Sequence, residues 1–397
     1  MTQADTPSAR RTYAGPAFLS FGFRPFFLAA GLWSAGSMMV WLAVVAGLLD
    51  LPDELDPVSW HAHEMLFGYA IAVIAGFALT AVPNWTGRLP VRGAPLTLLL
   101  LLWISGRLAV ACSWFLPIGV VATFDVAFLF VLTGFFVREI YAGRNWRNLP
   151  IAAAFGLLTI ANGVSYLPAF FAGADPAFAF RLALATIVIL ITLIGGRVIP
   201  SFTRNWLVKN GSDLRPAAFN RVDQIAILAV VIAALVWVTL PEHALAGFLL
   251  LIASAVSATR LSRWCGLGTL SEALVWSLHL GYAWLVFGLG LLGLSVLLAS
   301  LPASAAIHAL TAGAIGTMTL AVMTRATLGH TGRALTASSA TIAIYIAVTL
   351  SALVRVASGL GLMDGLPLLE LSGILWVFTF LLFAGVYGRM LLGNRSS

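Results

Sequence analysis

Residues 59–82, SWHAHEMLFGYAIAVIAGFALTAV, combine an apolar run with a cluster of ionisable side chains. From Glu64 onward the stretch is apolar over about the length that an α-helix needs to cross ~30 Å of hydrocarbon. His61, His63 and Glu64 stand where this run begins. Ionisable groups are expensive in a bilayer. The run therefore predicts a membrane helix, and the cluster predicts a functional site at one end of it.

The composition of the whole chain is that of a membrane protein. Of its 397 residues, 60% are hydrophobic and 9% are charged, whereas soluble domains carry about 25% charged residues. The net charge of +7 is not accompanied by a basic patch interleaved with aromatic residues. We therefore expect the partner to be a lipid bilayer and expect no nucleic acid.

Eleven further apolar runs resemble the first, so the sequence predicts an all-α fold of twelve transmembrane helices. Residues 1–25 are expected to form a cytoplasmic segment without a signal peptide, followed by a single domain over 26–397. The predicted helices are 26–49, 64–82, 95–111, 119–141, 149–171, 179–200, 223–240, 242–259, 272–297, 304–324, 339–359 and 367–390.

The basic residues predict the orientation of these helices. All but three of the 22 Lys and Arg residues lie in the N-terminal segment or at connections that follow even-numbered helices. Because positive charge is retained in the cytoplasm, both termini are predicted to be cytoplasmic. The exceptions, Arg107, Arg181 and Arg355, lie toward the outer ends of their helices. We expect buried ion pairs or anion contacts there rather than snorkelling side chains, with Asp125 available to Arg107.

A weak internal repeat predicts the arrangement of the helices. Pro83, Pro200 and Met323 occupy matching places at the inner ends of the second, sixth and tenth helices. Each interval is four helices, which predicts three four-helix units; chance similarity of short helix ends is the alternative. The matching stretches are AVPNWTGR (81–88), VIPSFTRNW (198–206) and VMTRATLGHTGR (322–333).

Two of the six histidines lie at similar depth near the outer face, His61 on the second helix and His308 on the tenth. If these helices are adjacent, two neutral imidazoles would clamp a haem iron axially. The alternative for a lone histidine in a membrane helix is a purely structural role, as a hydrogen-bonded core residue. His63 suits either a second metal or a hydrogen bond to Glu64.

The remaining candidate ligands lie toward the inner face. His279 is either a ligand or a core residue, and His330 suits a polar loop as well as a metal. Arg24, Arg88 and Arg197 are able to hold carboxylates such as haem propionates, although positive-inside anchoring explains them equally. No P-loop, HExxH, CxxC or nucleophile elbow appears, so ATP-driven and hydrolytic chemistry lose support.

Six stretches resemble the NnrS family, in order and over nearly the full chain. The resemblance implies a bacterial inner-membrane protein that carries haem and copper and acts in nitric oxide metabolism and protection from nitrosative stress. The stretches are FGFRPFF (21–27), WHAHEMLFGYAIAVIAGF (60–77), AVPNWTGRLPVRG (81–93), IGGRVIP (194–200), WSLHLGYAWL (276–285) and HALTAGAIGTMTLAVMTRATLGHTGR (308–333).

The chain is also distantly similar to subunit I of the haem–copper oxidases, which is built from twelve helices in three four-helix arcs. Its second-helix pattern matches His61-Ala62-His63-Glu64-Met65-Leu66-Phe67, and its tenth-helix pattern matches His308 with Gly313. Carried over position by position, the resemblance makes His61 and His308 the axial ligands of a low-spin b-type haem near the outer face.

The sequence also departs from the oxidase pattern. Ala306 stands where the ligand of the high-spin haem would be, and the sixth and seventh helices have no histidine for the usual copper. The dinuclear centre of that family is therefore not visible, and copper needs another site. The candidate ligands for copper are His63, Glu64, Met65, His279 and His330.

These observations favour a haem and copper protein that binds, reduces or relieves nitric oxide with electrons from an unknown donor. If it is a nitric oxide reductase-type oxidoreductase, Glu64 and Asp125 are the acids expected to pass protons. The alternatives are a secondary transporter, for which Arg107 with Asp125 is the best support, and an assembly factor that holds metal or haem without turnover.

Overall fold

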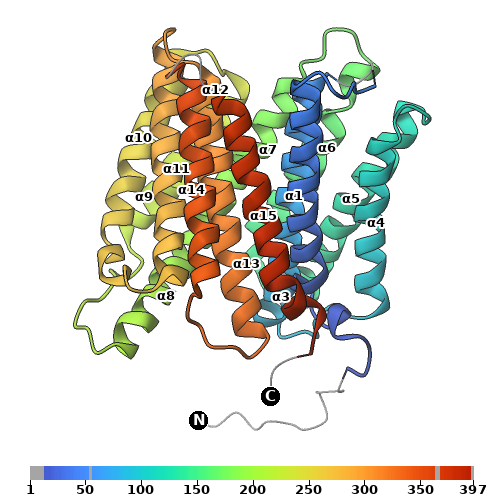
Figure 1. Ribbon diagram of the computed structural model, residues 1–397. Helices are drawn as coiled ribbons and strands as arrows, with labels where there is room; N and C mark the ends of the chain where they lie inside the picture. The colour runs from blue at the N-terminus through green and yellow to red at the C-terminus, as the bar shows by residue number, and fades with distance from the viewer. Residues whose placement is uncertain (1–12, 53–55, 363–366, 395–397) are drawn as a thin grey trace.

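Twelve helical spans make up the computed structural model, which describes residues 13–52, 56–362 and 367–394 (Figure 1). Each span is long and apolar enough to cross a membrane, and the described residues contain no strand, so the predicted all-α fold is confirmed. We number the spans 1 to 12 in chain order. Spans 1, 3–5, 7–9, 11 and 12 contain a single α-helix each, namely α1 (Phe23–Val45), α4 (Ala94–Ala111), α5 (Ile118–Ala142), α6 (Leu149–Val164, flanked by short 3-10 turns), α9 (Arg221–Thr239), α10 (Ala244–Ser262), α11 (Ala273–Leu297), α14 (Ser339–Gly359) and α15 (Leu368–Leu392).

Spans 2, 6 and 10, which carry the repeated motifs, differ from the others. They contain 27, 34 and 28 residues, against at most 25 elsewhere. Their apolar stretches are 78%, 56% and 72% buried, against at most 50% in the other spans, and each contacts the other two. Each is interrupted by a π-helical segment, and the parts are α2 (Pro57–His63), η2 (Glu64–Ala70) and α3 (Ile71–Thr86); α7 (Pro176–Leu190), η5 (Ile191–Gly195) and α8 (Gly196–Lys209); α12 (Ala303–His308), η7 (Ala309–Ile315) and α13 (Gly316–His330).

The remaining spans surround this central trio, and α1 packs against α15 (Figure 1). Arg24 links the two chain ends, because its Nη1 donates hydrogen bonds to the carbonyls of Leu391 (3.0 Å) and Gly393 (2.6 Å). We call the membrane face that holds both ends the terminal face and the opposite one the pocket face. That the terminal face is cytoplasmic stays a prediction.

Two of the central spans begin with an aspartate followed by a proline. Asp56 accepts a hydrogen bond from the Ser59 backbone N–H (2.8 Å), and Asp175 accepts one from that of Ala177 (2.8 Å). A side-chain acceptor before a proline in the first turn is a strong helix start. Span 2 therefore begins at Pro57, about two turns earlier than the apolar run at 64–82 predicted.

Gly196 allows a buried guanidinium to lie against span 6. Arg260 is 0% exposed; its Nε donates to Asp223 Oδ1 (2.9 Å) and its Nη1 to the carbonyl of Thr192 in η5 (2.9 Å). A Cβ at position 196 would lie 1.9 Å from Nη2 of Arg260. The ion pair between spans 7 and 8 can approach the π segment because residue 196 has no side chain.

Gly196→Ala is therefore expected to displace Arg260 and to lower the free energy of unfolding by roughly 1–3 kcal/mol, the usual cost of overpacking. Gly156→Ala is the matched control, since no atom lies within 4 Å of the added Cβ in α6. Thermal unfolding of the purified variants in detergent measures the stability of each. Equal unfolding temperatures for the two variants would contradict the close packing of Arg260 against Gly196.

Candidate functional site

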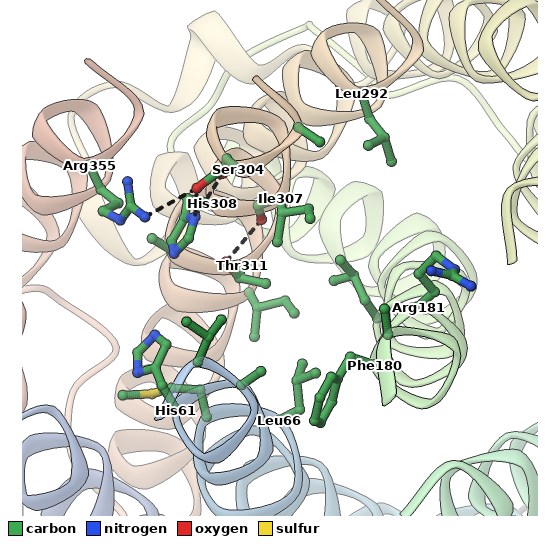
Figure 2. Close-up of a pocket in the computed structure, with 18 of the residues that line it drawn as sticks. His61, Leu66, Phe180, Arg181, Leu292, Ser304, Ile307, His308, Thr311 and Arg355 are labelled. Atoms are coloured by element: carbon green, nitrogen blue, oxygen red, sulfur yellow. Dashed lines mark hydrogen bonds between the residues drawn. The ribbon is translucent and has the colours of Figure 1, made fainter. Parts of the chain in front are cut away.

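A cavity of about 640 Å³ lies between the three central spans toward the pocket face (Figure 2). Its volume is within the range of roughly 300–1,000 Å³ found for ligand and cofactor sites. Its walls are mainly apolar and include Leu66, Phe180, Leu292, Ile307 and Trp376. We call it the central pocket.

His61 of span 2 and His308 of span 10 both line the central pocket, on the same side of it in Figure 2. The His61 ring stacks on Trp41 with centroids 4.6 Å apart, and its Nδ1 is buried without a hydrogen-bond partner among the described residues. His308 Nδ1 lies 2.7 Å from the Ser304 carbonyl and so donates to it, which leaves the Nε2 lone pair available. Metal-binding histidines commonly hold their second nitrogen in this way.

Two arginines also line the central pocket. Arg355 lies beside His308 and donates from Nη2 to Ser304 Oγ (3.2 Å), without a carboxylate partner among the described residues (Figure 2). Arg181 lies on the opposite side and pairs with Asp175 (3.0 Å). The sequence predicted ion pairs or anion contacts at both positions, but not that they share a cavity with the two imidazoles.

A buried charge network occupies the other side of span 2. Arg107 Nη1 donates to both carboxylate oxygens of Glu64 (2.7 Å each), and Nη2 donates to Asp125 Oδ1. His63 bridges the two carboxylates, at 3.0 Å from Glu64 Oε1 and 3.0 Å from Asp125 Oδ2. The predicted pairing of Arg107 with Asp125 is confirmed, and Glu64 is a second partner that the sequence did not indicate.

The charge network sets the rotation of span 2 about its own axis. Glu64 is the first residue of η2, and its Oε2 also accepts a hydrogen bond from Trp33 Nε1 (2.7 Å). Residues two apart on a helix point about 200° from one another. Because His63 is held in the network by these bonds, His61 is directed to the opposite side, into the central pocket.

His279, His330 and His243 do not line the central pocket. His279 Nε2 is 2.8 Å from Thr203 Oγ1. His330, predicted to lie in a loop, is the last residue of α13 and packs near the ring of Phe23 (5.4 Å). His243 caps α10. Over residues 13–52, 56–362 and 367–394, no three His, Cys, Asp or Glu side chains are grouped so that they could hold a metal ion.

The arginines predicted to bind a cofactor all lie in the terminal half of the molecule. Arg24 caps the last turn of α15, Arg88 pairs with Glu139 beside the connection after span 2, and Arg197 is exposed in α8. The central pocket opens toward the opposite face. Cofactor contacts from these three arginines would therefore require a second ligand site.

Fold and pocket together define a multi-pass membrane protein with a cofactor-sized cavity that carries two imidazoles and two guanidiniums. The family model described as NnrS protein matches residues 17–395, so the chain belongs to the NnrS family. Membership implies a role in the response to nitric oxide. No curated protein matches the chain.

Arg107→Gln is expected to destabilise the protein by about 3–5 kcal/mol, because it leaves two buried carboxylates without their cation. Neutralising all three groups, as Arg107→Gln with Glu64→Gln and Asp125→Asn, is expected to recover much of this loss. The control is Arg138→Gln, whose exposed side chain pairs with Glu139 and contributes below about 1 kcal/mol. Thermal unfolding in detergent compares the variants; a triple variant no more stable than Arg107→Gln would count against the network.

Proposed function

We propose that this chain is a haem protein of the nitric oxide response, with a b-type haem held in the central pocket by His61 and His308. The observation that carries the proposal is the meeting of two imidazoles, from two different central spans, in one cavity of cofactor size. A haem iron with two imidazole ligands supplies one-electron transfer. Reduction of nitric oxide by such a protein would also need a site where the gas can bind.

The surrounding residues suit this role. The Ser304 carbonyl holds the tautomer of His308, and Trp41 holds the plane of the His61 ring. Arg355 is a cation at membrane depth without an acidic partner among the described residues, which is unfavourable until an anion joins it. The carboxylates of a haem would supply that anion, with Arg181 as the second contact.

Copper does not fit the candidate ligands in the part of the chain that the structure describes. His63 is bonded to Glu64 and Asp125, His279 to Thr203, and no three-ligand group exists there.

Proton transfer by Glu64 and Asp125 stays a prediction. Both carboxylates are 1% exposed at the side chain and bonded to Arg107, which supports a role in positioning span 2. The proposal also includes nitric oxide as the small-molecule partner and an unknown electron donor. It places the protein in the bacterial inner membrane with both termini in the cytoplasm.

A reduced-minus-oxidised optical spectrum of the purified protein tests the haem ligands. Haem binding is expected to fall at least tenfold in both His61→Ala and His308→Ala, because each removes one axial ligand. His243→Ala, which changes only a helix cap, is expected to keep the wild-type spectrum. Haem retained in either ligand variant would refute the assignment, and wild-type protein without haem would favour a transporter or an assembly factor.

The carboxylate contacts are tested by reconstituting the apoprotein with haem and with its dimethyl ester, which lacks both carboxylates. Wild-type protein is expected to bind haem about tenfold more tightly than the ester, since a charge-assisted hydrogen bond contributes roughly 1.5–3 kcal/mol. Arg355→Gln is expected to reduce this preference, whereas Arg88→Gln at the terminal face is not. Equal binding of haem and ester by the wild type would refute the contact while leaving the iron ligands untouched.

A further inference from the structure

A second cavity, of about 280 Å³, lies at the terminal face, on the opposite side of the membrane from the central pocket. We call it the terminal niche. Residues from both ends of the described chain line it together with the end of α13, and they include Tyr13, Ser20, Arg24, His330 and Asn394. The niche thus brings together FGFRPFF (21–27) and the end of the stretch 308–333, two motifs to which the haem proposal gives no role.

The polar side chains of the terminal niche are mainly hydrogen-bond donors. Tyr13 carries a hydroxyl, Asn394 an amide, His330 an imidazole and Arg24 a guanidinium, and no carboxylate lines the cavity. The Ser20 hydroxyl already donates to the Ala17 carbonyl (2.6 Å). Donors of this kind, without an acid among them, suit an anion and not a metal cation.

Arg24 lines the niche, Arg333 interacts with Arg24 without lining the niche, and neither has an acidic partner among the described residues. Arg24 is only 3% exposed; Nη1 is used on the carbonyls of α15, and Nε is buried without a partner among the described residues. Arg333 Nη1 is also buried and unpartnered there, and the positive charge of Arg333 disfavours that of Arg24. A buried cation beside a half-buried one is unfavourable unless an anion lies near them.

We propose that the terminal niche binds a phosphate group. Several donors around one small cavity match the many acceptor positions of a phosphate, and guanidinium groups bind it with two hydrogen bonds at once. The niche lies at the ends of spans 1, 10 and 12, the depth at which lipid headgroups meet the protein. Basic pockets between helix ends recognise anionic lipid headgroups in this manner. The phosphate belongs either to such a headgroup or to a soluble phosphate.

The test uses full-length protein in nanodiscs of phosphatidylcholine, to which phosphatidylglycerol or inorganic phosphate is added, with bound lipid or phosphate counted by native mass spectrometry. The substitutions are His330→Gln, which changes the niche lining, and Arg333→Gln, which removes the second positive charge near Arg24 but lies outside the lining. Arg24 is left intact because it also caps α15. Arg389→Gln is the control, since Arg389 is exposed in the last turn of α15 at the same face and neither lines the niche nor has a buried nitrogen without a partner.

Wild-type protein is expected to retain phosphatidylglycerol or inorganic phosphate, and Arg333→Gln is expected to weaken that binding about fivefold. His330→Gln is expected to weaken it further when combined with Arg333→Gln. If inorganic phosphate displaces the lipid, the ligand is a soluble phosphate; if only phosphatidylglycerol is retained, it is a headgroup. Both results support the proposal.

Two results would overturn the proposal. The first is that wild-type protein retains neither phosphatidylglycerol nor inorganic phosphate in preference to phosphatidylcholine. The second is that Arg389→Gln loses as much binding as Arg333→Gln, which would mean that the general positive charge of this face attracts the phosphate. The haem spectrum of every variant is recorded alongside. It is expected to be unchanged, so the terminal niche and the central pocket are tested independently.

Discussion

The bonds between Arg107 and the carboxylates of Glu64 and Asp125 are the interaction on which the pocket depends. Three charges buried together are tolerable only if every one is paired and hydrogen-bonded, and here His63 and Trp33 complete the pairing. These bonds hold Glu64 and His63 in place and so fix the rotation of span 2 about its own axis. Because His61 lies two residues before His63, that rotation decides where the imidazole of His61 points.

The central trio divides the molecule into two regions with different chemistry. Toward the pocket face the three spans surround a cavity with apolar walls, two imidazoles and two guanidiniums. At the terminal face the chain ends meet the end of span 10, and Arg24 joins them through backbone carbonyls of α15. An electron-carrying cofactor near one face and a phosphate near the other would anchor the same span 10 at both of its ends.

The sequence predicted the twelve spans closely, because apolar length is a local property that needs no knowledge of neighbours. The largest errors fall on the central spans. Span 6 runs to Lys209 and passes through Pro200, where the apolar run had suggested an end. The polar ends of these helices are stabilised by neighbouring spans and by caps such as Asp175, and hydropathy does not detect either.

By itself the sequence determined the fold class and the number of spans, since these follow from composition and apolar length. It also predicted His61 and His308 as a ligand pair from their similar depth along the chain. Only the tertiary structure decided which arginines share the pocket with them. Arg181 and Arg355 line it, whereas Arg24 caps a helix at the other face. The physical reason is that the energy of a buried charge depends on which partners the packed helices bring within a few ångströms. No one-dimensional pattern contains that information.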